Sequence, residues 1–165
     1  MEEQGQLVDE ADRVIGSAPR SEIRARGLLH RGVAIMCRDP AGAIYVHRRT
    51  TTKDVFPGLY DMWAGGMVAA GEDYEDAARR EVAEELGVTG VPLTRLFAHH
   101  YTGADCPTWT TTFEVTWTGP VVPQAEEIAW GAFLPLDELL ARLDEWPFVP
   151  DGLELFRRWL SVATR

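Results

Sequence analysis

Three glutamates lie close together in a segment with helical character, and their spacing places them on one side of a helix. Glu81, Glu84 and Glu85 belong to the stretch 74–86, and at about 100° per residue they share an arc of roughly 100°. Glu81 and Glu85 are like charges at positions i and i+4, an arrangement that becomes more destabilising toward the interior of a protein. A hard divalent cation removes this repulsion, because Mg²⁺ prefers carboxylate oxygens and retains water. The spacing therefore predicts a site for Mg²⁺, with Mn²⁺ as an alternative.

The residues around this helix supply a backbone that can approach a cation. Gly65 and Gly66 precede the helix, and glycines have no side chain to keep a ligand away from their carbonyl oxygens. Arg80 adjoins Glu81 and can hold a carboxylate through paired hydrogen bonds. Glutamate-rich helices are also common as solvated faces, so a purely structural role for the three acids stays open at this point.

The segment 65–88 carries a resemblance to a known family. Its sequence, GGMVAAGEDYEDAARREVAEELGV, resembles the Nudix box, G-x5-E-x7-R-E-U-x-E-E-x-G-U, in which U is aliphatic. A chance match somewhere in a chain of this length is on the order of one in ten million. The likeness extends to most of residues 29–163. The residues that match the fixed positions are Gly66, Glu72, Arg80, Glu81, Val82, Glu84, Glu85, Gly87 and Val88.

The Nudix resemblance implies an α/β fold, namely an α/β/α sandwich with a mixed β-sheet and a loop–helix–loop metal site. The metal ligands that it implies are Glu81, Glu85, Glu84 and the carbonyl of Gly66. The catalytic residues that it implies are Glu84, Glu81 and Arg80. Arg80 would act by positioning the helix together with Glu72. Glu84 is either a third ligand or the base that activates water, and Glu127 in a later loop is an alternative base.

The activity that the resemblance implies is Mg²⁺-dependent hydrolysis of a diphosphate linkage. The substrate would be a small nucleoside diphosphate derivative or a related organic diphosphate, attacked by a metal-activated water. By the same resemblance, Arg49 and Lys53 would bind the diphosphate, although a solvated strand end is an equally open interpretation of this pair. Candidate walls of a base or ring pocket are Tyr60, Trp63, His99, His100 and Tyr101.

Within the family, the chain most resembles the branch close to isopentenyl-diphosphate isomerase. The shared pattern includes Leu29-His30-Arg31, Arg48-Arg49, Lys53 and Phe56-Pro57-Gly58. Isomerases carry a cysteine and a histidine just before the box, where this chain has Gly65-Gly66-Met67-Val68. Prenyl-diphosphate isomerisation is therefore an alternative that lacks its reacting groups. A non-catalytic Nudix module that senses a nucleotide is the other alternative.

The apolar pattern predicts which elements would position these groups. Residues 1–28 are expected to form an N-terminal extension, a β-hairpin followed by a short helix that starts near Pro19. Residues 29–165 are expected to form one Nudix hydrolase domain. Strands are predicted at 33–37, buried on both faces and paired as a hairpin with 44–47, and at 96–101 and 109–118, the last covered on one face.

Three helices are predicted from the 3.6-residue period. The segment 74–86 has Asp73 as a helix cap and ends at Gly87. Two further helices are expected to pack apolar stripes against the core. They are 136–143, with Leu136, Leu139, Leu140 and Leu143, and 153–162, with Leu155, Phe156, Trp159 and Leu160.

Composition limits the partners that the chain can have. A formal net charge of −10 disfavours polymeric nucleic acid and anionic membranes, whereas a small diphosphate remains compatible if a cation screens it. The apolar runs are too short for a bilayer and the N-terminus lacks a signal peptide, so a cytoplasmic location is expected. Cys37 and Cys106 are expected to be reduced thiols. The N-terminal hairpin is a candidate dimerisation or lid element, which leaves a homodimer open.

Overall fold

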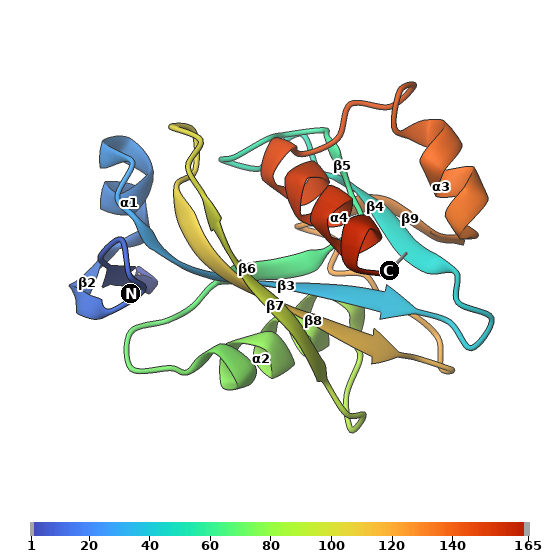
Figure 1. Cartoon of the computed structure of the whole chain (residues 1–165), viewed down its shortest axis with the longest axis horizontal. Coiled ribbons are helices and arrows are strands. Elements are labelled where there is room, and N and C mark those ends of the chain that lie inside the picture. Colours follow the sequence, from blue (N-terminus) through green and yellow to red (C-terminus); the bar gives the residue numbers. More distant parts are fainter. Residues whose placement is uncertain (1, 164–165) are drawn as a thin grey trace.

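The computed structural model describes residues 2–163, which form nine strands and four helices. The strands are β1 (Gln4–Val8), β2 (Val14–Pro19), β3 (His30–Arg38), β4 (Ile44–Arg49), β5 (Tyr60–Asp61), β6 (Ala64–Met67), β7 (Thr94–Tyr101), β8 (Thr108–Thr116) and β9 (Ile128–Leu134). The helices are α1 (Arg20–Arg26), α2 (Tyr74–Leu86), α3 (Leu136–Arg142) and α4 (Pro150–Ala163). Figure 1 shows α2 on one face of the sheet and α4 on the other.

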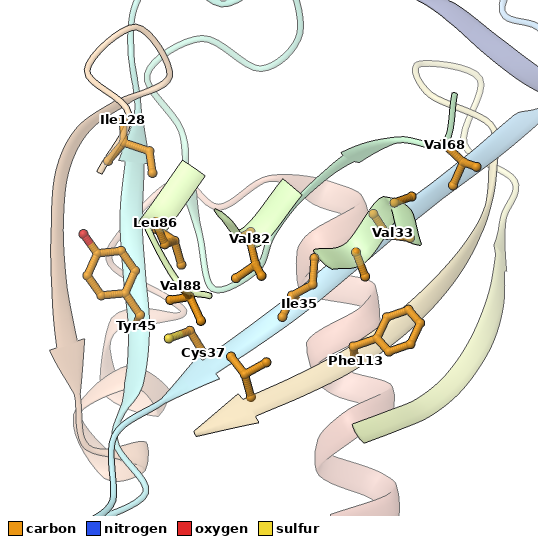
Figure 2. Packing of buried hydrophobic residues seen from close by; sticks show 14 residues of the cluster. Val33, Ile35, Cys37, Tyr45, Val68, Val82, Leu86, Val88, Phe113 and Ile128 are labelled. Carbon is orange, nitrogen blue, oxygen red and sulfur yellow. The ribbon is translucent and has the colours of Figure 1, made fainter. Parts of the chain in front are cut away.

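Strand β3 is the centre of a mixed sheet. It pairs in parallel with β8 along its whole length and antiparallel with β6 from Gly32 to Ile35. Its side chains alternate between two hydrophobic cores. Ile35 joins Val82 of α2 in one core, which Figure 2 shows, and Met36 joins Phe156 of α4 in the other. A strand with both faces buried, between helices on each side, confirms the predicted α/β/α sandwich with a mixed sheet.

Strand β8 corrects one expectation. The period of two along 109–118 predicts one covered face, yet Thr111 and Thr112 are both fully buried, although they lie on opposite faces. Thr112 pairs with Ala34 and therefore shares the α4 side of the sheet. Its hydroxyl donates a 2.9 Å hydrogen bond to the carbonyl of Phe97 in β7. Because this polar group is satisfied by the backbone, it can be buried without water.

Strands β3 and β4 form the predicted hairpin but stay together only briefly. Within residues 2–163 they share a single ladder pair, Arg38 with Ile44. Away from this pair, β3 is hydrogen-bonded to β6 instead of β4, and β4 pairs with β5 at His47 and Arg48. Strand β9 borders the other side of β4. The sheet is therefore divided into two halves that separate toward one end.

Helix α2 has the predicted boundaries, and its caps explain them. The Asp73 carboxylate accepts a 2.8 Å hydrogen bond from the Asp76 N–H, which satisfies one free donor of the first turn. Gly87 ends the helix with a φ of 70°, a conformation that glycine adopts without steric penalty. Ala78 is fully buried on this helix, and Glu81 is only 8% exposed. Packing of the alanine face against the sheet thus carries the first glutamate inward.

The other helices differ from their predictions in two details. Helix α4 begins at Pro150, three residues before the predicted start at Leu153, and proline is favourable in the first helical turn. In α3, Leu139 is fully buried but Leu140 is 40% exposed. The assignment of Leu140 to the core stripe is therefore wrong, because this seven-residue helix presents only a narrow face to the sheet.

The N-terminal segment forms the predicted hairpin and helix. β1 pairs with β2 and contacts β3 through Leu7 and His30, and α1 follows with Pro19 as its N-cap. None of the helices in the described part of the chain combines the length and apolar character needed to cross a bilayer.

Leu139→Ala is expected to lower the free energy of unfolding by about 2–5 kcal/mol, because it removes a fully buried side chain and leaves a cavity. Leu140→Ala, one position along the same helix, should change it by less than about 0.5 kcal/mol. Urea denaturation of both variants measures the difference. Similar losses in the two variants would contradict this packing of α3.

Candidate active site

A cavity of about 520 Å³ opens where the two halves of the sheet separate. Segments from α1, β3, β4, β6, α2 and the start of α4 form its walls. A volume of this size suits a small organic ligand. The residues predicted from the sequence as metal ligands, catalytic groups or diphosphate-binding groups all line this cavity, namely Arg49, Lys53, Gly66, Arg80, Glu81, Glu84, Glu85 and Glu127. Their roles as ligands or catalysts stay predictions.

Glu81 and Glu85 form the acidic side of the cavity. Glu81 accepts a 2.8 Å hydrogen bond from Arg80 Nη1, and Glu85 accepts one of 3.2 Å from the Gly65 N–H. Burial raises the pKa of Glu85 to about 8, and the neighbouring charge of Glu81 adds to this effect. Burial also raises the pKa of Glu81, although Arg80 opposes the shift. Two neighbouring carboxylates of one helix therefore lie in a place that disfavours their charge.

Gly66 leaves room for the Glu81 carboxylate. A Cβ atom at position 66 would lie 2.6 Å from Glu81 Oε1, closer than real Cβ contacts. Because β6 pairs Gly66 with Val33 of β3, the backbone there is fixed next to the acid. The box glycine thus provides a site in which backbone and carboxylate oxygens can meet.

Arg80 connects the box helix to the loop before it. Its guanidinium donates to both oxygens of Glu72 at 2.9 Å and to the Met67 carbonyl at 3.2 Å. The paired hydrogen bonds from Arg80 lower the pKa of Glu72. Glu84 lies 3.5 Å from the same guanidinium, and its side chain is 52% exposed. The three glutamates therefore differ, with Glu84 at the mouth of the cavity.

Arg49 and Lys53 form a basic wall of the cavity. Arg49 donates through Nε to the Val55 carbonyl at 3.1 Å, which leaves its terminal nitrogens for other partners. Lys53 forms an ion pair with Glu127, and its burial, followed by the charge of Arg49, lowers the pKa of its ammonium group. The Lys53 side chain is only 13% exposed in this ion pair. The interpretation of Lys53 as part of a fully solvated strand end is therefore wrong.

Sequence reasoning missed five charged residues of this cavity, one of which is Glu3. Arg20 and Arg24 of α1 reach it from the N-terminal segment, where Arg20 donates two 3.2 Å hydrogen bonds to Asp54. Their i and i+4 spacing places both on one face of α1, a signal that could have been used. Asp61 and Asp151 also line the cavity. No local pattern connects these two acids, because the fold alone brings β5 and α4 together.

The candidate aromatic wall is largely absent from the cavity. Of the five aromatic and histidine side chains considered, Trp63 is the one that lines it. Trp63 is held by a 3.0 Å hydrogen bond from its indole nitrogen to the Gly152 carbonyl. Among residues 2–163, no three His, Cys, Asp or Glu side chains form a preassembled ligand cluster. Arg80 contacts one oxygen of Glu81 and also lies 3.5 Å from the half-exposed Glu84.

The family model described as the NUDIX domain matches residues 28–156. This match fits a chain whose mixed sheet lies between helices and whose box glutamates line one cavity together with basic side chains. The chain belongs to the Nudix family, and it is a Nudix-type hydrolase that acts on diphosphate linkages. Enzymes of this family generally use divalent metals such as Mg²⁺ and take small diphosphate substrates.

Relatives with similar sequences carry the same family name. An uncharacterized Nudix hydrolase of Streptomyces coelicolor is 54% identical over 154 residues, which cover 92% of this chain and 85% of the relative. The uncharacterized Nudix hydrolase YfcD of Escherichia coli is 39% identical over 155 residues, covering 94% and 85% of the two chains. Neither is named as an isomerase, so the likeness to the isopentenyl-diphosphate isomerase branch stays a prediction.

Solved structures show the same fold. The protein DR0079 of Deinococcus radiodurans superposes with a TM-score of 0.83 at 30% identity, over 94% of this chain and 98% of that one. The NUDIX domain of Shewanella oneidensis NrtR, complexed with ADP ribose, gives a TM-score of 0.64 at 17% identity, over 88% and 99% of the chains. The second likeness concerns the fold alone.

Gly66→Ala is expected to preserve the fold but to displace the Glu81 carboxylate, the end of a flexible side chain. Hydrolase activity should fall by about a hundredfold, as it does when a reacting group moves by roughly 1 Å. Gly65→Ala is the contrasting variant, because its Cβ would lie 2.0 Å from the Val33 carbonyl oxygen and disrupt strand pairing. Circular dichroism and activity assays separate the two effects. Full activity in Gly66→Ala would contradict the tight contact.

His47 gives a pH prediction for stability. It is 3% exposed, and burial, followed by the charges of Arg49 and Lys53, lowers its pKa from 6.5 to about 3. The unfolded chain takes up a proton near pH 6.5 whereas the folded state does not, so acid favours unfolding.

Relative to His47→Gln, the wild type should therefore lose about 1.4 kcal/mol of stability per pH unit below the ordinary histidine pKa. Denaturant titrations of both proteins across this range measure the effect. A difference between the two proteins that stays constant with pH would rule out a buried neutral His47.

Proposed function

We propose that the protein hydrolyses a diphosphate linkage in a nucleoside diphosphate derivative or a related small organic diphosphate, with Mg²⁺ or Mn²⁺ as cofactor. The observation that carries this proposal is that acidic and basic side chains line one cavity. Glu81 and Glu85 supply carboxylates, and Arg49 and Lys53 supply positive charges. A diphosphate needs both, because its oxygens bind cations and basic side chains alike.

The residues present fit a hard divalent cation. Glu81 and Glu85 are like charges in a site whose burial raises the pKa of both, and a bound cation would reverse that shift. Gly66 has no side chain to fill the space beside Glu81. Glu81, Glu85 and the Gly66 carbonyl would therefore hold the ion. When bound, it would neutralise charge on the diphosphate and acidify a water molecule.

The basic wall would bind and orient the diphosphate. Arg49 can offer its terminal nitrogens to phosphate oxygens, since its Nε is already engaged by Val55. Lys53 would exchange its contact with Glu127 for a phosphate oxygen, or keep both at one end of the cavity. Fixing both phosphates in this way places one phosphorus in line with a water on the acidic side.

Glu84 is the residue that we propose as the proton acceptor. It lines the cavity, stays half exposed and has a longer, 3.5 Å contact with Arg80, whereas Glu127, the other candidate, is less exposed and is hydrogen-bonded directly to Lys53. The attacking water gives a proton to Glu84 as its oxygen forms a bond to phosphorus. The bond from that phosphorus to the bridging oxygen breaks, and the leaving phosphate takes the electron pair.

Arg80 is a positioning residue in this proposal. It contacts Glu81 and Glu72 at once, so it fixes the box helix against the loop that follows β6. The Nudix domain of NrtR, which is complexed with ADP ribose, supports the choice of a nucleoside diphosphate derivative as the substrate class. The acidic surface of the chain supports a small soluble substrate in the cytoplasm rather than a nucleic acid.

Glu81→Gln and Glu85→Gln should each lower kcat by about a hundredfold or more, because each removes a charge that would hold the cation. Glu75→Gln is the matched control, since Glu75 lies on the same helix, is exposed and pairs only with Arg79 among the described contacts. Assays should use nucleoside diphosphates, dinucleotides and nucleoside diphosphate sugars with Mg²⁺.

Chelation with EDTA should abolish turnover, and added Mg²⁺ should restore it. If no member of the panel is hydrolysed by folded wild type, or if the glutamine variants match Glu75→Gln, the proposed function is wrong.

A further inference from the structure

A buried histidine of the cavity has no part in the hydrolytic steps above. His47 lies in β4, is 3% exposed and lines the cavity. Within residues 2–163, its ring forms no hydrogen bond or ion pair with another side chain or with the backbone. Its ring nitrogens are not among the fully enclosed side-chain atoms of the described residues that lack a partner. A molecule in the cavity can therefore reach them.

The other buried histidine of the cavity shows what a structural imidazole looks like in this fold. His30 is also 3% exposed and lines the cavity. Its Nδ1 lies 2.8 Å from the Leu28 carbonyl oxygen, and because a carbonyl oxygen only accepts, Nδ1 is the donor. The His30 ring is thus held by the backbone, whereas the His47 ring has no such partner among the described residues.

The alternation of side chains along β4 places His47 beside Arg49. Tyr45 packs in the core on the α2 side of the sheet, which Figure 2 shows, and Val46 packs in the core on the other side. His47 and Arg49 follow Tyr45 at steps of two residues, so their side chains leave the strand on its side. Both residues line the cavity, whereas Arg48 between them does not.

The spacing of the two residues suits a single diphosphate group. Residues two apart on a strand are separated by about 7 Å, and a diphosphate with a hydrogen bond at each end can bridge that distance. His47 is buried and Arg49 is only partly buried, so the histidine lies at the inner end of this row. A diphosphate bound by Arg49 would have its inner oxygens next to the imidazole.

The chemistry of the ring at this place favours a donor without charge. Burial, followed by the charges of Arg49 and Lys53, lowers the pKa of His47 to about 3. A neutral imidazole has one N–H donor and one acceptor nitrogen. Ionised phosphate oxygens only accept, so the N–H is the group that can pair with them. A third cation here would be repelled by the two basic side chains, whereas a neutral donor is not.

We propose that His47 is a further substrate-binding residue, whose ring N–H donates a hydrogen bond to a diphosphate oxygen of the substrate next to Arg49. This inference rests on the proposed function and adds a neutral donor to the basic wall. Holding the cation is not its role, because Mg²⁺ prefers oxygen ligands to imidazole.

Calorimetric titration tests this contact without relying on turnover. The probe is methylenediphosphonate, a non-hydrolysable diphosphate, in the presence of Mg²⁺. Folded His47→Leu should bind it at least about tenfold more weakly than wild type, because a hydrogen bond to a charged acceptor is lost. His47→Gln keeps an N–H donor and should lose less. Mg²⁺ alone should bind His47→Leu as it binds wild type. His100→Gln is the matched control, since His100 does not line the cavity.

Nuclear magnetic resonance of wild type labelled with ¹⁵N-histidine gives a second measurement, which holds even if His47→Leu does not fold. The His47 signals are those absent from His47→Gln. At neutral pH they should show one protonated and one unprotonated ring nitrogen. Methylenediphosphonate with Mg²⁺ should shift the protonated nitrogen and leave the ring singly protonated, while the signals of His99 and His100 stay in place.

Several results would overturn the role of His47. They are full affinity for methylenediphosphonate in folded His47→Leu, weaker binding of Mg²⁺ alone in that variant, His47 signals that the probe does not move, and no binding of the probe by wild type. Hydrolysis is measured separately, so the two proposals can fail independently. Turnover together with probe binding that ignores His47 would reject this inference alone. Probe binding through His47 without turnover of any diphosphate would keep the inference and reject the function.

Discussion

Burial of two like charges on one helix face is the constraint on which the site depends. Helix α2 is capped at both ends and packed through its alanines, so it cannot rotate to expose Glu81 and Glu85. Arg80 satisfies part of Glu81, and a backbone N–H satisfies part of Glu85. The two carboxylates that still repel each other line a cavity and are not enclosed in the hydrophobic core. A fold that holds its acids in this way has free energy to gain from a cation.

The parts of this arrangement that a sequence can predict are the local ones. The limits of α2 follow from Asp73, Gly87 and a 3.6-residue period, all of which act within a few residues. The Nudix box is also a pattern within one short segment, so its glutamates could be predicted together from the sequence. Asp61 and Asp151 were not found, because they meet only after β3 and β4 separate and α4 closes over the gap. Such contacts depend on chain topology, which periodicity does not encode.

The incorrect expectations have a common physical origin. A period of two predicts which side chains share a face, but it does not predict what covers that face. Thr112 can be buried because its hydroxyl donates a hydrogen bond to a backbone carbonyl. Leu140 shows the converse in α3, where an apolar residue at helical spacing stays exposed. Burial is decided by the neighbouring layer, whereas periodicity describes only the element itself.

Arg20 and Arg24 enter the cavity from α1, before the segment 28–156 that the family model matches. Part of the cavity wall is therefore formed by side chains outside the segment that carries the Nudix box. Mutations in the N-terminal hairpin or helix can change which molecules are admitted while the box stays intact. The substrate range of such enzymes can therefore diverge while the Nudix box stays unchanged.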